Sequence, residues 1–320
     1  MQRFRFRSLA ALFGAASLLP FAVAAAPFAY ISNQLADTVA IVDMQTGKVV
    51  ETLPVPGKPA GVAAAPDGKR VYVSTPDNGS VAVIDAESRQ LIAHPKVSSG
   101  ALGIATDGTG KRLFVADWYK NIVTVLEVDN LQAVKAVTVG RSPSGLTVSP
   151  DNRWLYVANR LSDSVSKIDL ETLKVTGSVA VGAHPFGLVL DNEGKRLYTA
   201  NVESNDVTVV DALQMKAIAT VKVRARPYAG ALAQNDSRLL VTNQDDDSVS
   251  VIDTETLKEL DVIEVGGKPE GIGTHSDDRH VYVANWFDGT VSVLDAKALR
   301  VVDTIKTGEG SRAFGRFIGN

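Results

Sequence analysis

Hydrophobic and polar residues alternate with a period of two in short runs along most of the chain. Residues 281–285 and 290–295 are clear examples, and both runs are rich in β-branched and aromatic residues. Gly, Asn, Asp and Pro bound these runs, and such alternation is typical of half-buried β-strands, not of helices. The pattern therefore predicts an all-β protein.

The strand pattern recurs every 42 residues from Tyr30 to the end of the chain. One slot of the repeat is aromatic in almost every copy, and a second slot is always acidic. The two series are Tyr30, Tyr72, Phe114, Tyr156, Tyr198, Leu240, Tyr282 and Asp43, Asp85, Glu127, Asp169, Asp211, Asp253, Asp295. A fixed period of this length indicates a repeat architecture whose units bury their faces against their neighbours.

Each repeat has room for four short strands, which we name A to D in chain order. In the last complete repeat we expect them at residues 269–273, 281–285, 290–295 and 301–305. Four short strands in a repeat of about 40 residues describe one blade of a β-propeller. We therefore predict a seven-bladed β-propeller with four antiparallel strands per blade.

The residues between these strands fit the same fold. Gly68, Gly110, Asn152 and Gly194 stand between strands A and B, where a tight hairpin needs a positive φ. An acidic residue such as Asp253 starts the C-to-D turn, where its carboxylate can accept N–H groups of the turn. A slot in strand A is always small, as expected if seven strands converge on one axis; it holds Gly61, Gly103, Gly145, Gly187, Ala229, Gly271 and Ala313.

The two ends of the chain predict how the ring closes. The repeats begin at a B strand, residues 28–33, and end at an A strand, residues 311–318. We therefore expect the C-terminal strand to lie beside the N-terminal one and complete the first blade. Such closure leaves no open sheet edge to aggregate.

The first residues have the features of a secretory signal peptide. Three arginines precede an apolar run at residues 9–23, and small residues follow it. We predict cleavage after Ala24, or as late as Ala26, which leaves residues 27–320 as a single propeller domain. The expected location is the periplasm, without membrane insertion.

Composition excludes several kinds of site. The chain has no cysteine, which removes disulfides, thiolate metal ligands, covalent c-type haem attachment and thiol nucleophiles. The net charge is −3, and about −6 without the leader arginines, so the protein is a poor non-specific binder of nucleic acid. Any nucleic-acid contact would need a local basic patch.

Residues 156–159 and 282–285 both read Tyr-Val-Ala-Asn, and residues 139–145, 181–187 and 265–271 read Val-Gly-x-x-Pro-x-Gly. These motifs resemble the YVTN-repeat family of exported bacterial seven-bladed β-propellers, along the whole mature chain. The resemblance implies the fold. Relatives in this broad group include binding proteins, surface-layer proteins, dehydrogenase subunits and haem d1-type domains, so it does not imply one activity.

Comparison among the copies separates blade residues from candidate site residues, because a residue repeated in every blade is explained by the blade. The D-to-A crossings and B-to-C loops share one face, which we call the crossing face. The slot before the small residue of strand A is uneven there: it reads Ala60, Leu102, Ser144, Phe186, Tyr228, Glu270 and Arg312. Basic residues gather in the crossings and acidic residues in the loops, an arrangement that would focus an anion onto the axis.

We therefore predict a binding site for an anionic or planar ligand at the axial mouth of the crossing face, with aromatic residues available for stacking. Its candidate residues are Trp118, Arg141, Arg160, His184, Phe186, Arg226, Tyr228, Glu270, Trp286 and Arg312. The leading function is an exported binding or interaction protein, expected to be a monomer. Single-stranded nucleic acid and a periplasmic partner protein are both compatible ligands.

Enzymatic alternatives rest on fewer residues. Glu270 and Arg312 occupy one slot in adjacent blades, so they could pair at the mouth or serve a lactonase-like hydrolase. A redox accessory of the haem d1 or quinone-dehydrogenase kind is the other alternative. His184 as a lone metal or haem ligand and residues 245–247 as a calcium loop are less favoured. We predict no catalytic residue, no metal site and no cofactor.

Overall fold

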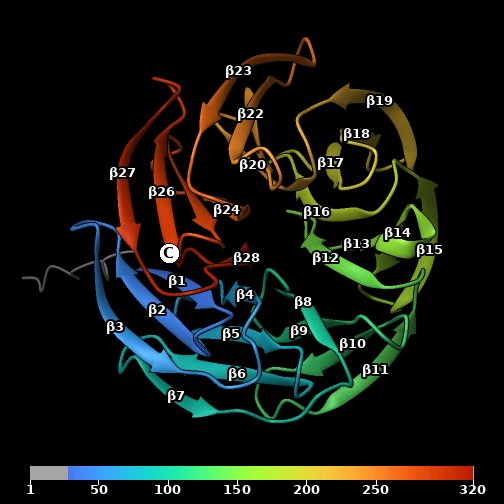
Figure 1. The fold of residues 1–320 in the computed structure, drawn as a ribbon. Helices are drawn as coiled ribbons and strands as arrows, with labels where there is room; N and C mark the ends of the chain where they lie inside the picture. Colours follow the sequence, from blue (N-terminus) through green and yellow to red (C-terminus); the bar gives the residue numbers. More distant parts are fainter. Residues whose placement is uncertain (1–27, 320) are drawn as a thin grey trace, which may run out of the picture.

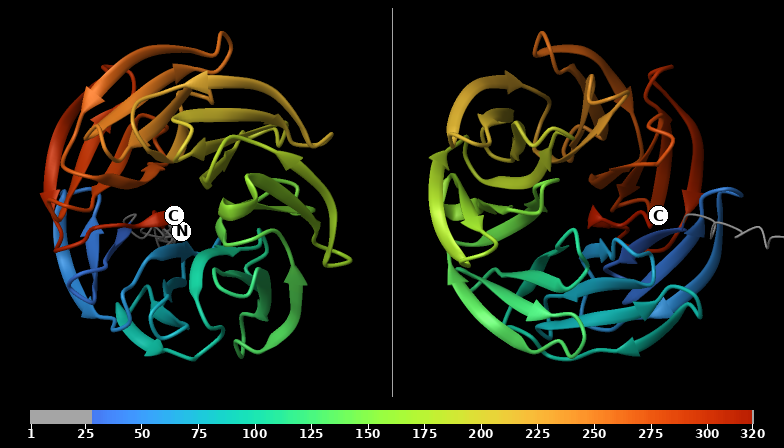
Figure 2. Two further views of the ribbon diagram at one scale, coloured as in Figure 1. Left: turned by 45° about the vertical axis from the view of Figure 1, so that its right-hand side comes forward. Right: turned by 180° about the vertical axis from the view of Figure 1, so that it is seen from behind.

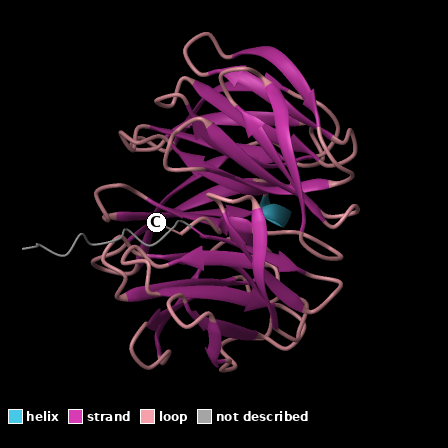
Figure 3. Ribbon diagram, turned by 90° about the vertical axis from the view of Figure 1, so that its left-hand side faces the viewer, coloured by secondary structure: helices cyan, strands magenta, loops and turns pink. Residues whose placement is uncertain are grey.

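The computed structural model describes residues 28–319, and these form a ring of seven β-sheets around a central axis (Figure 1). The views from other directions show the same ring from behind and from the side (Figures 2 and 3). The predicted seven-bladed β-propeller is therefore confirmed. The predicted signal peptide lies outside the described residues. Among residues 28–319, no helix has the length and apolar character needed to cross a membrane.

The strands follow the order A to D from the axis outward. The A strands are β4 (Gly61–Ala64), β8 (Ala101–Thr106), β12 (Pro143–Val148), β16 (Pro185–Leu190), β20 (Pro227–Ala233) and β24 (Pro269–Thr274). The B strands are β1 (Phe28–Asn33), β5 (Arg70–Thr75), β9 (Arg112–Asp117), β13 (Trp154–Asn159), β17 (Arg196–Asn201), β21 (Arg238–Asn243) and β25 (His280–Asn285). The predicted bounds in the last complete repeat agree with β24 and β25 to within one residue.

The outer half of each blade is built from the C and D strands. The C strands are β2 (Thr38–Asp43), β6 (Ser80–Asp85), β10 (Ile122–Glu127), β14 (Ser164–Asp169), β18 (Asp206–Asp211), β22 (Ser248–Asp253) and β26 (Thr290–Asp295). The D strands are β3 (Lys48–Pro54), β7 (Gln90–Ala93), β11 (Ala133–Thr138), β15 (Lys174–Ala180), β19 (Lys216–Lys222), β23 (Lys258–Glu264) and β27 (Arg300–Lys306). The one helix of the described chain is the short η1 (Arg160–Ser162), in a B-to-C loop.

The turn chemistry predicted from the sequence is present. Gly68 has φ of 69° and Asn152 has φ of 56°, so both A-to-B turns use the left-handed region. Oδ1 of Asp253 accepts the backbone N–H of Thr256 at 2.8 Å, and Oδ1 of Asp295 accepts that of Ala298 at 2.9 Å. The repeated acidic slot therefore stabilises the C-to-D turns.

The small slot of strand A is required by close backbone contacts between neighbouring blades. A Cβ atom on Gly103 would lie 1.7 Å from the backbone oxygen of Ser144, and one on Gly271 would lie 2.2 Å from that of Ala313. Neither contact is compatible with a side chain. The glycines are therefore explained by the convergence of the A strands on the axis, as predicted.

The ring closes where the sequence places it, with one addition. Tyr30 N–H donates to the Phe317 carbonyl at 2.8 Å, and Gly319 N–H donates to that of Phe28 at 2.8 Å, so residues 311–319 lie beside β1. Within this segment β28 (Phe314–Arg316) also pairs in parallel with β4 of the next blade. The C-terminal segment thus joins two blades, whereas the sequence predicted a contact with one.

Candidate functional site

Three aromatic rings meet on the axis near the crossing face. The ring centroids of Phe186 and Tyr228 are 4.1 Å apart, and those of Phe186 and Phe314 are 5.3 Å apart. Their relative exposures are 3%, 6% and 5%. Leu102 packs in the same cluster. Phe186 and Tyr228 are thus part of the core at this end of the axis, although the sequence suggested that they line an open mouth.

Glu270 and Arg312 extend this cluster with a buried ion pair, which confirms the pairing considered from the sequence. Nε of Arg312 lies 2.8 Å from Oε2 of Glu270, and Nη2 of Arg312 donates to the Tyr228 hydroxyl. Nε2 of Gln244 donates to Oε1 of Glu270 at 2.7 Å. Burial raises the pKa of Glu270, although the charge of Arg312 opposes that shift. We call Leu102, Phe186, Tyr228, Glu270, Arg312 and Phe314 the axial plug.

The charges around the plug are paired with one another. Arg226 lies 2.8 Å from Glu203 and 3.5 Å from Asp245, and Lys268 lies 2.6 Å from Asp245. A basic centre that focuses an anion requires unpaired cations, whereas these side chains offset each other locally. The structure therefore weakens the electrostatic argument for a site on this face.

The other predicted residues lie in the surrounding loops and make local contacts. His184 lies 3.7 Å from the Glu203 carboxylate, Arg160 stacks over the Trp118 ring at 5.4 Å, Arg141 donates to the Leu161 carbonyl at 2.5 Å, and Trp286 donates to the Gln34 side chain at 3.1 Å. The ten predicted residues are thus distributed between the axial plug and the loop rim around it. Binding of a ligand by any of them stays a prediction.

A cavity of about 870 Å³ occupies the axis on the other side of the plug. It is lined by the second halves of the A strands and by the A-to-B turns, so it belongs to the opposite face, which we call the turn face. Phe314 is part of both the plug and the cavity lining, which places the plug at the inner end of the cavity. The sequence predicts no site on this face.

A single slot of the repeat explains why this space is empty. Six of the cavity-lining residues are 42 positions apart in strand A or the segment that completes the ring: Ala105, Thr147, Val189, Ala231, Gly273 and Gly315. They are small or short, whereas the slot three residues earlier supplies Phe186, Tyr228, Glu270 and Arg312 to the plug. The same comparison among copies could therefore have predicted the cavity.

The cavity walls combine apolar and polar side chains and include one basic residue. Leu146, Leu188, Leu232 and Ile272 contribute to the walls. Among the described lining residues, Arg316 is the only lysine or arginine, and burial lowers the pKa of its guanidinium. Its slot holds no basic residue in the other copies, so a comparison of the copies on this face would have marked it as a candidate.

The carboxylates on the cavity rim connect neighbouring blades. Oδ2 of Asp236 accepts the Asn192 N–H at 2.7 Å, and Oδ2 of Asp278 accepts the Asn235 N–H at 2.5 Å. Burial raises the pKa of Asp236, and the nearby charges of Asp191 and Asp278 raise it further. These acidic groups thus have a structural role at the rim.

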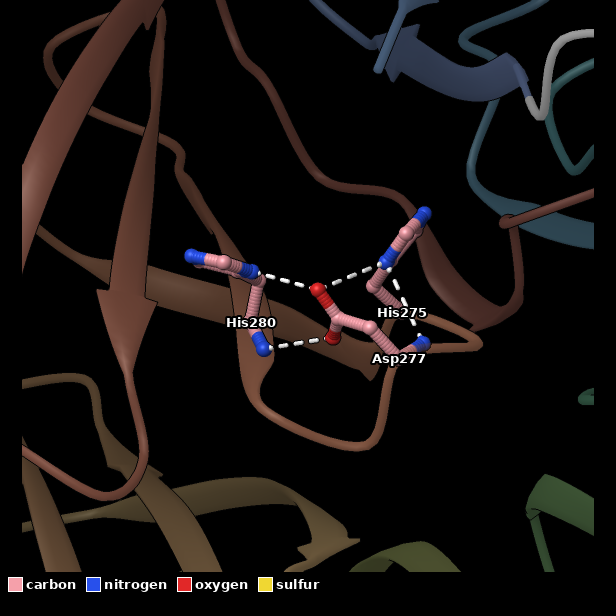
Figure 4. Close-up of side chains that lie close together, drawn as sticks. All are labelled: His275, Asp277 and His280. Atoms are coloured by element: carbon pink, nitrogen blue, oxygen red, sulfur yellow. Dashed lines mark hydrogen bonds and ion pairs between the residues drawn. The ribbon is translucent and has the colours of Figure 1, made fainter. Parts of the chain in front are cut away.

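Two histidines and an aspartate converge in the A-to-B hairpin that joins β24 to β25 (Figure 4). Oδ2 of Asp277 lies 3.2 Å from Nδ1 of His275 and 2.5 Å from Nδ1 of His280. Neither histidine was among the candidate residues predicted from the sequence. Their positions at the two ends of one predicted hairpin were the signal that could have joined them.

Comparison with known proteins supports the fold and leaves the activity open. Three family models match parts of the chain: "Lactonase, 7-bladed beta-propeller" over residues 129–216, "Cytochrome D1 heme domain" over residues 201–313 and "YNCE-like beta-propeller" over residues 7–107. Each covers less than half of the chain. No curated protein shows a significant match.

Three solved structures illustrate the likeness of fold. Kuenenia stuttgartiensis hydrazine synthase matches with a TM-score of 0.76 and 22% identity, over 83% of this chain and 91% of that one. The dihydro-heme d1 dehydrogenase NirN in complex with DHE matches with a TM-score of 0.68 and 16% identity, over 88% and 63%.

A functionally unknown protein from Desulfotomaculum acetoxidans DSM 771 matches with a TM-score of 0.78 and 11% identity, over 90% of this chain and 99% of that one. At these identities the likeness concerns the fold alone. The chain is therefore a seven-bladed β-propeller similar to those of the lactonase, YNCE-like and cytochrome d1 groups.

Proposed function

We propose that this protein is an exported binding propeller that holds a small organic anion in the axial cavity of the turn face. The observation that carries the proposal is the position of Arg316, a solvent-exposed cation in the wall of a cavity whose inner end is plugged. A guanidinium can bind a carboxylate or phosphate through two parallel hydrogen bonds. The proposed site therefore lies on the turn face, at the opposite end of the axis from the mouth predicted from the sequence.

The size and lining of the cavity support a small-molecule ligand. Its volume of about 870 Å³ lies within the ~300–1,000 Å³ typical of ligand pockets. Leu146, Leu188 and Ile272 offer apolar surface to the body of such a ligand. Asp236 and Asp278 on the rim accept backbone N–H groups of the neighbouring turns. We expect a carboxylic acid with an apolar body.

Thermal shift with a panel of aliphatic and aromatic mono- and dicarboxylates tests the site. At least one acid should raise the melting temperature of the wild type. Arg316→Gln removes the cation and Thr147→Trp fills the cavity, so both should abolish the shift. Matched controls are Arg226→Gln on the crossing face and Thr176→Trp on the exposed outer strand β15, which should retain it.

Two results would contradict the cavity as the binding site. One is loss of the shift in Arg226→Gln with its retention in Arg316→Gln, which would restore the crossing-face mouth as the site. The other is an unshifted wild type together with native mass spectrometry that detects no retained molecule. Salt-dependent binding of single-stranded oligonucleotides would point to the nucleic-acid alternative.

A bound cofactor is the second candidate, favoured by the match of residues 201–313 to the cytochrome D1 heme domain model. That segment includes β24 and the turn with His275, which lines the cavity. Protein purified from its native host should then show a visible absorption band that Thr147→Trp removes. A colourless preparation with a carboxylate-dependent melting temperature would exclude this candidate in favour of the first.

Export is part of the proposal because of the N-terminal leader. Periplasmic protein should have lost residues 1–24, or at most 1–26, and the intact mass shows this directly. Full-length protein found only in the cytoplasm would contradict it.

A further inference from the structure

The hairpin between β24 and β25 differs from the hairpins of the other blades at two slots. Where this blade has His275, the described A-to-B hairpins of the others have Ala65, Asp107, Ser149, Asp191 and Ala233. Where it has His280, they have Arg70, Arg112, Trp154, Arg196 and Arg238. Both histidines are thus departures from the blade pattern, so packing of the blade alone does not explain them.

The residue that His280 replaces has a defined structural role. Nη1 of Arg112 donates to the Leu170 carbonyl at 2.5 Å, and Nη1 of Arg196 donates to the Thr254 carbonyl at 2.6 Å. Each of these bonds connects a blade to the next blade. In its place His280 directs Nδ1 to the Asp277 carboxylate, so this hairpin gives up an inter-blade bond for a local contact.

The three side chains are held by the hairpin itself. His275 N–H donates to the His280 carbonyl at 2.8 Å, which fixes the two histidines across from each other. Oδ1 of Asp277 accepts the N–H groups of Arg279 and His280, each at 2.9 Å. This leaves Oδ2 facing both imidazoles (Figure 4). The donor atoms are therefore preorganised at one point.

The neighbouring Arg279 turns its guanidinium to Asp295, with Nε 2.9 Å from Oδ2. Because Arg279 pairs with Asp295, Oδ2 of Asp277 faces only the two imidazoles among its ion-pair partners in the described chain.

We propose that His275, Asp277 and His280 bind a divalent transition-metal ion of the zinc class. Nδ1 of each histidine faces Oδ2 of Asp277. One possible ligand atom from each of the three residues lies within 4.8 Å of the other two. An ion there would replace the 3.3 Å contact between Asp277 N–H and Nδ1 of His275. Two imidazoles and one carboxylate suit Zn²⁺ and its neighbours, whereas Ca²⁺ and Mg²⁺ require mainly oxygen ligands.

Three protein ligands leave at least one coordination position open to water or to a bound molecule. His275 and Asp278 both line the axial cavity, so the ion lies at its rim. The metal site stands on the hairpin geometry, and it holds whether or not the cavity binds an organic acid.

Equilibrium dialysis of untagged protein against buffered Zn²⁺, with bound metal measured by plasma mass spectrometry, tests the proposal. The wild type should retain about one ion per chain, and Co²⁺ should give the visible bands of a low-symmetry site. Asp277→Asn and His280→Arg should lose the ion. His280→Arg inserts the residue that most other blades have at this slot, so its fold should be intact.

The matched control is His94→Gln, which removes a histidine on a different blade, hydrogen-bonded to Thr75. It should retain the ion. Full metal occupancy in a folded His280→Arg, equal loss in His94→Gln, or no bound Zn²⁺ in the wild type would each overturn the site. Repeating the carboxylate panel in EDTA separates this outcome from failure of the proposed function, because Arg316 binds without the ion.

Discussion

The two ends of the propeller axis are built from the same strands and have opposite character. At the crossing face, large side chains of the A strands pack into a plug around Phe186, Tyr228 and the Glu270–Arg312 pair. At the turn face, small residues such as Ala231 and Gly273 leave a cavity of about 870 Å³. A shift of three residues along the A strand therefore separates the packed plug from the cavity. Large aromatic and charged side chains near a propeller axis can therefore close the axis instead of forming an open binding site.

Removing the C-terminal segment should have the largest effect, because this segment contributes to both ends of the axis. Deletion of residues 311–320 takes Arg312 and Phe314 from the plug, Arg316 from the cavity and the hydrogen bonds to β1 and β4. We expect loss of cooperative unfolding, because two blades then expose strand edges. Urea unfolding followed by circular dichroism measures this. An unchanged unfolding curve would refute closure by the C-terminal segment.

Breaking the ion pair of the plug should have the next largest effect. Arg312→Met leaves the buried Glu270 carboxylate without its partner, which costs about 3–5 kcal/mol in unfolding free energy. Arg226→Met on the same face removes partly exposed pairs and should cost less than about 1 kcal/mol. Chemical denaturation measures both.

A double variant distinguishes the cost of an unpaired buried charge from the cost of losing the pair. Glu270→Leu with Arg312→Met removes both charges and should recover most of the stability that the single change loses. Equal losses in Arg312→Met and Arg226→Met would show that the plug pair contributes no more than a surface pair.

Replacing His280 should have a smaller effect that depends on metal. Without metal, His280→Arg should change the unfolding free energy by no more than about 1 kcal/mol, since one hydrogen bond to the next blade replaces one to Asp277. With Zn²⁺ in excess, the wild type should gain stability by mass action and the variant should not. Equal stabilisation of both by Zn²⁺ would place the ion elsewhere.

The smallest expected effect is a difference in pH dependence between the two ends. On the turn face, hydrogen bonds from Arg279 hold the pKa of Asp295 well below its usual value of about 3.9. Because the folded pKa is depressed, the stabilisation is present above that usual value and is lost as the pH falls further. Asp295→Asn should therefore flatten the acid limb of the stability curve below about pH 4.

The contribution of Glu270 to stability should change with pH in the opposite direction. Its folded pKa is raised, so its contribution favours folding at low pH and is lost as the pH rises above the usual Glu value of about 4.3. Stability measured from acid to neutral pH in Asp295→Asn and Glu270→Gln checks both signs. Identical slopes in the two variants would contradict the assignment.

The sequence predicts the fold well because the same strand and turn signals occur in every copy of the repeat. The strand bounds, the positive-φ turns, the small slot and the place of ring closure each follow from residues that recur in register. The parallel pairing of β28 with β4 does not follow, because it occurs once and depends on where the last segment lies after the ring has closed.

The candidate site was less predictable for a physical reason. Variation at the slot of Phe186 and Tyr228 shows that the blade does not dictate the residue, but it does not show whether large side chains there stand open or pack together. Their contacts with Phe314 come from a different blade. The small residues that line the cavity recur at one slot of the repeat. His275 and His280 are instead departures from the residues of the other copies. A comparison of the copies on both faces would therefore have found both features.

The C-terminal segment, residues 311–319, also affects the order in which the parts of this molecule can fold. Residues 314–319 contact strands that are made first, β1 and β4, across almost the whole length of the chain. Local hairpins can form as each repeat emerges, but the contacts of longest sequence separation wait for the final segment. Until that segment arrives, the chain is an open arc, and its plug and cavity do not yet exist.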